Sequence, residues 1–347
     1  MTNAIGNRQS AYAAAGVDIT AGNRAVDLMR EAVRSTHTSA VLAGVGAFGG
    51  MIDLQTALGA RAPVLVASTD GVGTKTMLAS AMGRYDTVGH DIVNHCVNDI
   101  LVQGARPLFF LDYVASARLE PDHVAAIVRG CAEACRAVQC VLLGGETAEM
   151  PGVYQPGAFD LAGTMVGWVE RESIVDGRAV RAGDICLGLP SSGLHTNGFS
   201  LARRVFANTS WDTIFLELGK PLGEVLLTPH RAYLKELEAL WSAGVKVKGM
   251  AHLTGGGFVE NIPRALPEGV GVSIDRKAWE VPAIFDLIQE LGHVDEAEMY
   301  RVFNMGIGMV LLVSPDQVEQ ALATLQGQAV VIGQAVPWDG NTPRVRL

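Results

Sequence analysis

A single lysine stands in a glycine-containing loop that directly follows an apolar segment. Residues 63–68 form this segment, which we predict to be a buried strand, and residues 70–75 have the sequence Asp-Gly-Val-Gly-Thr-Lys. Glycines after a strand let backbone N–H groups approach an anion, and a lysine ammonium suits phosphate, although the loop lacks the Walker A spacing. The chain has six lysines and 21 arginines, and Lys75 is the only lysine before Lys220. We therefore predict phosphate contacts from Gly71, Gly73, Thr74 and Lys75.

Four carboxylates lie where strands end or on a neighbouring helix. Asp70 lies at the end of one apolar strand and Asp112 near the end of another, Glu146 follows a third strand, and Asp99 lies on a predicted helix. The carboxyl ends of parallel strands share one edge of a sheet, so these groups could converge. Mg²⁺ is commonly held by one or two carboxylates together with substrate phosphates. The set therefore predicts a magnesium nucleotide site, whereas each acid alone is equally well interpreted as a solvated loop residue or a helix cap.

Two polar clusters precede predicted helix starts in the second half of the chain. Residues 195–197 read His-Thr-Asn, and residues 252–257 read His-Leu-Thr-Gly-Gly-Gly. The free N–H groups of a helix start bind anions, which favours a substrate role for both clusters. Helix capping by Thr196 or Asn197, with structural histidines, is the competing interpretation.

A glycine-rich stretch at residues 44–49 fits the G-x-G-x-x-G pattern of dinucleotide sites. Asp70 lies 21 residues beyond Gly49, near the offset of a ribose-binding acid. The preceding strand and the following helix would both be short, which weakens the case for NAD. We favour a glycine loop that closes over a ligand, with an inert surface loop as the alternative.

The elements that must position these groups alternate between strands and helices, which indicates an α/β architecture with mixed sheets. The turn-rich segment 176–184 is the best domain boundary, and we place the domains at residues 1–172 and 173–347. We expect helices at 23–34, 76 onward, 91–104, after 121, 199–206 and 233–241. We expect strands at 108–113, 141–143, 162–169, 185–189, 309–313 and 329–332.

Composition excludes several function classes. The net charge of −9 offers no basic surface for nucleic acid or an anionic membrane, and 49% apolar residues exclude a disordered polyanion. The N-terminus lacks an apolar leader, so we expect a soluble cytosolic protein. Five cysteines in a long chain do not suggest a disulfide framework, and Cys131 and Cys135 are better interpreted as buried apolar residues than as a metal pair.

Taken together, these motifs resemble those of the phosphoribosylformylglycinamidine cyclo-ligase (aminoimidazole ribonucleotide synthetase) family of purine biosynthesis. The motifs Asp-Gly-Val-Gly-Thr-Lys, Gly-Gly-Glu-Thr-Ala-Glu-Met-Pro and Phe-Asn-Met-Gly-Ile-Gly-Met carry the resemblance. Further matching segments are residues 15–19, 48–50, 96–107, 109–113, 190–200 and 251–263. The resemblance implies a two-domain fold and a homodimer joined through the N-terminal domains. It also implies ATP and Mg²⁺, with K⁺ activation as a family trait, and small-molecule nucleotide substrates.

The family reaction closes an imidazole ring. ATP activates the formyl oxygen of formylglycinamidine ribonucleotide, the amidine nitrogen attacks, and phosphate is released. Carried onto this chain, the resemblance assigns catalytic roles to Lys75, His195 and Asp112 and metal binding to Asp70, Asp99 and Glu146. It implies nucleotide contacts from Gly44, Gly46, Phe48, Gly49, Gly50, Asp70, Gly71, Gly73, Thr74, Lys75, Asn98 and Asp99. It implies substrate contacts from Glu146, Thr147, His195, Thr196, Asn197, Thr254, Gly255, Gly256 and Gly257. Alternatives are a small-molecule kinase resembling thiamine monophosphate kinase, a dinucleotide-dependent oxidoreductase and a non-catalytic nucleotide-binding protein.

Overall fold

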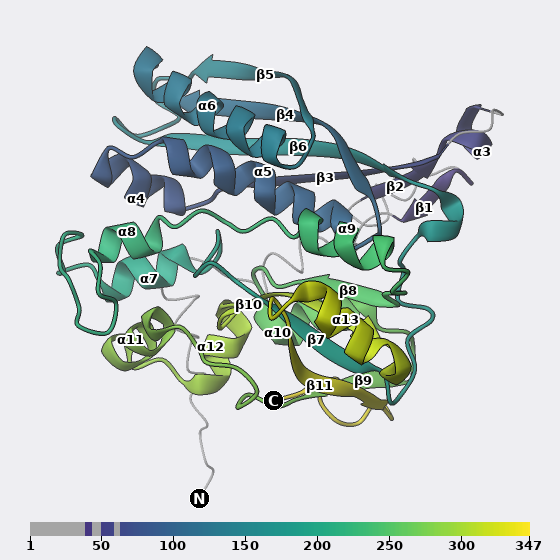
Figure 1. The fold of residues 1–347 in the computed structure, drawn as a ribbon. Coiled ribbons are helices and arrows are strands. Elements are labelled where there is room, and N and C mark those ends of the chain that lie inside the picture. Colours follow the sequence, from purple (N-terminus) through teal and green to yellow (C-terminus); the bar gives the residue numbers. More distant parts are fainter. Residues whose placement is uncertain (1–38, 44–49, 59–62) are drawn as a thin grey trace, which may run out of the picture.

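The described part of the chain folds into two six-stranded sheets, each with helices packed against it (Figure 1). A computed structural model describes residues 39–43, 50–58 and 63–347. All strands of the first sheet precede residue 170, and all strands of the second follow residue 184. This division agrees with the mixed α/β class expected from the sequence, while the boundary between residues 172 and 173 stays a prediction.

The first sheet has the strand order β1-β2-β3-β6-β4-β5. Its strands are β1 (Val41–Ala43), β2 (Gly50–Asp53), β3 (Val64–Gly71), β4 (Arg106–Ser116), β5 (Val141–Glu149) and β6 (Phe159–Val169). Both β3 and β4 pair antiparallel with β6, and β4 pairs parallel with β5. Strands β3, β4 and β5 therefore run in the same direction, and their carboxyl ends share one edge, as the sequence predicted.

Three longer helices and one short helix accompany this sheet. They are α3 (Leu54–Leu58), α4 (Lys75–Met82), α5 (Asp86–Leu101) and α6 (Pro121–Ala137). Helix α5 lies between the first sheet and the second half of the chain (Figure 1). It packs closely on α6 through two glycines: a Cβ on Gly89 would stand 2.2 Å from the carbonyl oxygen of Ile127, and one on Gly130 would stand 2.1 Å from that of Asp86. Any larger residue at either position would force the helices apart.

The second sheet has the order β12-β9-β11-β7-β10-β8. Its strands are β7 (Ile185–Pro190), β8 (Gly249–His252), β9 (Val270–Ile274), β10 (Ile307–Val313), β11 (Val330–Pro337) and β12 (Val345–Arg346). The helices are α7 (Phe199–Val205), α8 (Leu222–Leu226), α9 (Leu234–Ser242), α10 (Gly257–Asn261), α11 (Ala283–Gly292), α12 (Glu296–Val302) and α13 (Val318–Leu325). Every residue of β10, which lies between β7 and β8, is buried, in agreement with its continuous apolar sequence.

Most elements expected within the described residues are present, and the clearest difference is the length of one strand. We predicted that the strand beginning at Val141 ends at residue 143, but β5 continues to Glu149 because it pairs with β4 along that length. The expected helix at 23–34 lies outside the described residues. Cys131 and Cys135 are buried and free, as predicted. Among the described helices, none has the length and apolar character needed to cross a membrane.

Candidate active site

A polar stripe runs along the face of α5 that meets the second half of the chain. Asp91, Asn94, His95, Asn98 and Asp99 recur at spacings of three or four residues along α5, so they share one face. The Asn94 amide donates to the carbonyl of His230 (2.6 Å), and the Asn98 amide donates to that of Arg231 (2.8 Å). The stripe therefore places the segment before α9 against the first half of the chain.

His95 connects the two carboxylates that the sequence assigned to a metal. Its Nε2 lies 2.9 Å from Asp70 Oδ2 and 3.7 Å from Asp99 Oδ2. The Asp70 side chain is 43% exposed, whereas that of Asp99 is 7% exposed. Asp99 is also bound by the Ser68 hydroxyl (3.0 Å). Asp70 is therefore the solvent-facing end of a buried carboxylate and histidine cluster.

Three histidines of the second half complete this cluster. His252 Nδ1 lies 2.8 Å from Asp99 Oδ1, and His252 Nε2 lies 3.0 Å from His230 Nε2. The ring of His195 stacks on that of His230 at 3.9 Å between centroids. All three are almost fully buried. The interface between the halves is therefore a continuous polar network leading inward from Asp70.

Lys75 lies within the same interface and is completely buried. Its Nζ is 2.8 Å from both oxygens of Asp91 and donates to the carbonyls of His195 (3.0 Å) and Thr228 (2.9 Å). Three acceptor groups match the three N–H bonds of an ammonium, which favours the charged form of the pair. Burial lowers the pKa of Lys75, and the Asp91 carboxylate opposes this effect. Lys75 therefore cannot make the predicted contact with a phosphate while it keeps these three hydrogen bonds.

The histidines differ in protonation. Burial alone would lower the pKa of His95, but the carboxylates of Asp70 and Asp99 outweigh it and raise the pKa to about 9. Burial and the nearby cations hold the pKa of His195 and of His230 well below the usual range. At neutral pH the cluster therefore contains a protonated His95 beside neutral His195 and His230.

We expect the imidazole of His95 to titrate near pH 9 in metal-free protein, as followed by the NMR chemical shift of its Cε1 proton. Because the pKa of His95 in the folded state is above the ordinary 6.5, protonation of His95 stabilises the fold. This stabilisation is complete below pH 6.5 and is lost as the pH rises through 9. It corresponds to about 3 kcal/mol of unfolding free energy. Histidine NMR would measure the midpoint, and His95→Gln would assign the resonance. A midpoint below pH 7 would contradict the assignment.

The predicted substrate loops lie beside this cluster. The Thr196 hydroxyl is 2.6 Å from His95 Nδ1. Residues 254–257 turn into α10 with positive φ at Gly256 and Gly257, and the Asn261 amide donates to the Gly257 carbonyl (2.8 Å). A Cβ on Gly255 would stand 3.3 Å from Asn197 Oδ1, so the two loops are neighbours. The structure therefore brings together both polar clusters singled out in the sequence.

Two predicted carboxylates are placed apart from Asp70. Asp112 and Asp70 both pair with Gly163 of β6, so they share the helix-covered face but are separated by one strand. Burial raises the pKa of Asp112. Glu146 pairs with Tyr113, the residue after Asp112 on β4. Because successive side chains of a strand point to opposite faces, Glu146 projects from the other face of the sheet, where it is exposed. Within one chain Glu146 does not join Asp70 and Asp99, so the predicted three-carboxylate metal set is not assembled.

The remaining predicted residues occupy the edges of the site. Gly73 has φ +66°, and the Thr74 hydroxyl lies 3.1 Å from that of Ser200 across the interface. Thr147 is exposed on β5. Gly50 begins β2. The other members of the predicted nucleotide loop, Gly44, Gly46, Phe48 and Gly49, lie outside the described residues.

In the part of the chain that the structure describes, two groups of side chains have the donor spacing of a metal site. His195, His230 and His252 form one, and His95, Asp99 and His252 form the other, with donor atoms within 4.8 Å of one another. In both, most donor atoms are already hydrogen bonded within the protein: His195 Nε2 accepts from the Ser192 N–H, and His252 Nδ1 pairs with Asp99. We therefore describe them as parts of one hydrogen-bonded network.

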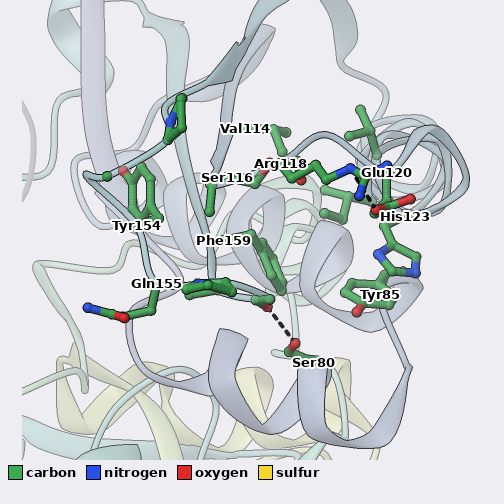
Figure 2. Close-up of a pocket in the computed structure, with 18 residues that line it drawn as sticks. Ser80, Tyr85, Val114, Ser116, Arg118, Glu120, His123, Tyr154, Gln155 and Phe159 are labelled. Atoms are coloured by element: carbon green, nitrogen blue, oxygen red, sulfur yellow. Dashed lines mark hydrogen bonds and ion pairs between the residues drawn. The ribbon is translucent and has the colours of Figure 1, made fainter.

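A separate cavity of about 610 Å³ opens where β4 ends and β6 begins. Figure 2 shows Tyr85 and His123 on one side, Tyr154 on the other and Phe159 at the centre. The Tyr85 and His123 rings stack at 4.0 Å, and the Ser80 hydroxyl donates to the Gly157 carbonyl (2.8 Å). Among the described residues, none of those predicted to bind ligand lines this cavity.

Comparison with known proteins identifies the chain. Residues 53–169 match the model "AIR synthase related protein, N-terminal domain", and residues 181–346 match its C-terminal domain. A phosphoribosylformylglycinamidine cyclo-ligase of Desulfitobacterium hafniense is 54% identical over 91% of this chain and 92% of its own length. The chain belongs to the phosphoribosylformylglycinamidine cyclo-ligase family. A cyclo-ligase of Shouchella clausii is 52% identical over 96% of this chain and 97% of its own.

Solved structures outside the cyclo-ligase family share the fold. Thiamine monophosphate kinase from Aquifex aeolicus has a TM-score of 0.58 at 14% identity, covering 81% of this chain and 91% of its own. The hydrogenase maturation protein HypE of E. coli has a TM-score of 0.58 at 20% identity, covering 90% and 93%. At such identities the likeness concerns the fold alone.

Several residues of the site in this member of the cyclo-ligase family were not predicted from the sequence. Asp91, His95 and His230 make several of the polar contacts between the two halves, and none of them was predicted. The available signal was the stripe on α5, because polar residues that repeat every three or four positions, with apolar residues between them, mark a polar contact face. His230 has no comparable signal, since it lies in an irregular segment before α9.

Proposed function

We propose that this protein catalyses the ATP-dependent ring closure of formylglycinamidine ribonucleotide to 5-aminoimidazole ribonucleotide, releasing ADP and phosphate. The observation that carries the proposal is identity above 50% along nearly the whole chain to proteins named for this activity. The cluster at Asp70 and His95 supports it, because a half-exposed carboxylate leads into a buried, proton-carrying network. A cytoplasmic location and activation by K⁺ belong to the same proposal.

The donor chemistry around Asp70 fits a magnesium nucleotide. Mg²⁺ needs only one or two carboxylates when phosphates supply other oxygens, and Asp70 is the accessible carboxylate of the cluster. Asp99 is the second candidate, although Ser68 and His252 already bind its oxygens. When bound, the metal would neutralise the phosphates and make the terminal phosphoryl group easier to transfer. Neither Glu146 nor Lys75 faces Asp70 in this arrangement.

The chain's own residues would orient the substrate and handle protons. The loops at Thr196, Asn197 and Gly255 offer hydroxyl, amide and backbone donors beside the cluster, suited to a ribose 5′-phosphate. His195 Nε2 accepts from Ser192, so its neutral ring carries the proton on Nδ1, which has no hydrogen-bond partner among the described residues. We propose His195 as the group that moves a proton during ring closure.

Purified protein tests this function directly. With ATP, Mg²⁺ and formylglycinamidine ribonucleotide, ADP and aminoimidazole ribonucleotide should form in equal amounts. The principal alternative, a kinase resembling thiamine monophosphate kinase, predicts phosphorylation of thiamine phosphate without ring closure. That result would overturn the proposal, as would protection from thermal unfolding by NAD but not by ATP.

We also propose that the protein forms a homodimer through the face of the first sheet opposite α4, α5 and α6. Leu108 and Leu111 on β4 and Val141 and Leu143 on β5 are exposed there, and β5 is an edge strand. Several large apolar side chains on one sheet face mark an interaction surface. A second copy is the proposed occupant because the cyclo-ligase resemblance implies pairing through N-terminal domains.

Replacing both Leu111 and Leu143 with glutamate should convert the dimer into a folded monomer. Charges placed in an apolar interface lose hydration without gaining partners, so association should weaken by at least a hundredfold. Light scattering coupled to size-exclusion chromatography measures this. Leu216→Glu is the control, because Leu216 is 93% exposed in the second half of the chain. An unchanged mass for the double variant would exclude this face.

A further inference from the structure

Lys75 and Asp91 form a buried pair at the centre of the interface between the two halves, and its contacts reach two separate segments of the second half. We propose that Lys75 is a positioning residue that fixes the backbones of His195 and of segment 228–230, and that it does not bind the phosphates of ATP. The inference rests on the proposed cyclo-ligase function, because it assigns how the site is held in its working geometry.

The first contact fixes an unusual backbone conformation. His195 has φ +64°, in the left-handed region that non-glycine residues rarely adopt. Its carbonyl accepts from Lys75 Nζ at 3.0 Å, while its ring accepts from the Ser192 N–H at 3.1 Å. A Cβ on Gly308 would stand 2.5 Å from His195 Cε1, so the space beside the ring exists only because that residue is glycine. Lys75 thus secures a conformation that the local sequence alone disfavours.

The second contact acts on both sides of Pro229. Lys75 Nζ donates to the carbonyl of Thr228 (2.9 Å), and the N–H of His230 donates to Asp91 Oδ1 (2.7 Å). His230 in turn stacks on His195 and reaches His252. One ion pair therefore determines where two neighbouring imidazoles lie, and its loss would release both at once.

Binding a phosphate would require Lys75 to abandon these contacts. The residue has no exposed surface, and the Phe199 ring lies 5.4 Å from Nζ. Movement toward a ligand would remove the ammonium from two carbonyl groups and would leave the buried Asp91 carboxylate with the His230 N–H as its donor. Such orphaned buried groups are costly, whereas Mg²⁺ bound at the accessible Asp70 carboxylate would hold the phosphates without this loss.

The two roles predict opposite effects on nucleotide affinity. We would measure kcat, KM for ATP and the Kd of a non-hydrolysable ATP analogue with Mg²⁺ for Lys75→Met and Asp91→Asn. The positioning role predicts that kcat falls at least thirtyfold in both variants while the Kd changes less than threefold. It also predicts a combined loss in the double variant no larger than that of Lys75→Met. A phosphate role predicts a Kd increase of thirtyfold or more in Lys75→Met alone, which would overturn the proposal.

Histidine NMR supplies a readout that does not depend on turnover. The resonances of His195 and His230 should shift in Asp91→Asn, which keeps the size of the side chain and is the variant to use if Lys75→Met does not fold. Lys248→Met is the matched control, because it removes a lysine paired with Asp184 (2.6 Å) away from the cluster. Unmoved His195 and His230 resonances in Asp91→Asn would overturn the positioning role. If the wild type closes no ring, the proposed function fails, while the Kd and NMR results still decide the role of Lys75.

Discussion

Replacing Asp70 with asparagine is expected to lower the rate of ring closure about a thousandfold, equivalent to about 4 kcal/mol of transition-state stabilisation. Asparagine keeps the size and one acceptor oxygen but removes the negative charge. Asp70 is the accessible carboxylate of the cluster and pairs with His95 at 2.9 Å. Its pKa is held below the usual range because His95 outweighs the effect of burial, so it is ionised at neutral pH. The variant therefore loses the negative charge that we propose binds Mg²⁺ with ATP.

Steady-state kinetics at several Mg²⁺ concentrations would measure this effect. We expect both a lower kcat and a higher Mg²⁺ requirement for Asp70→Asn. Asp86→Asn provides the control, because Asp86 is an exposed acid paired with Arg84 at the start of α5. Turnover of Asp70→Asn within threefold of the wild type would remove Asp70 from the proposed site.

Lys75→Met is expected to lower the free energy of unfolding by about 3 to 5 kcal/mol. The substitution leaves Asp91 completely buried, with the His230 N–H as its remaining donor within this set of contacts. Burial already raises the pKa of Asp91, so removal of the ammonium leaves a charge with little compensation. For cooperative units of this size, each kcal/mol shifts Tm by about 2 to 4 °C, which predicts a decrease of about 10 °C.

Differential scanning calorimetry at pH 7 measures that decrease, and a second substitution identifies its cause. In Lys75→Met with Asp91→Leu, no unpaired charge remains, so the double variant should recover a large part of the lost stability. The partly exposed pair of Lys248 and Asp184 gives the reference: Lys248→Met should cost less than Lys75→Met. Equal Tm values for wild type and Lys75→Met would show that the buried pair contributes nothing to stability.

Local signals in the sequence predicted the fold well. The apolar run before Asp70, the proline and aspartate at the start of α6 and the glycine turn before α10 each specify an element through short-range chemistry. The expected end of β5 was wrong because Gly144 and Gly145 suggested a turn, whereas pairing with β4 continues the strand. A Cβ on Gly145 would stand 2.4 Å from Asp112 Oδ1, so the glycine serves close packing rather than a turn.

The candidate site was only partly predictable because its contacts join distant segments. Asp70, Asp99 and His195 were found from their local context, whereas the partnership of Lys75 with Asp91 and Thr228 depends on how the two halves meet. A lysine in a glycine loop has the same sequence signature whether it faces a phosphate or a buried carboxylate. Strand register likewise decides that Glu146 projects away from Asp70, and a single residue of offset reverses the outcome.

A crystal structure with Mg²⁺ and a non-hydrolysable ATP analogue would show where the reacting phosphates lie. We expect Mg²⁺ within about 2.1 Å of the Asp70 carboxylate, with phosphate oxygens as its other ligands. We also expect Lys75 to remain paired with Asp91. Phosphates bound away from Asp70, for example in the cavity lined by Tyr85 and Phe159, would contradict the proposed site.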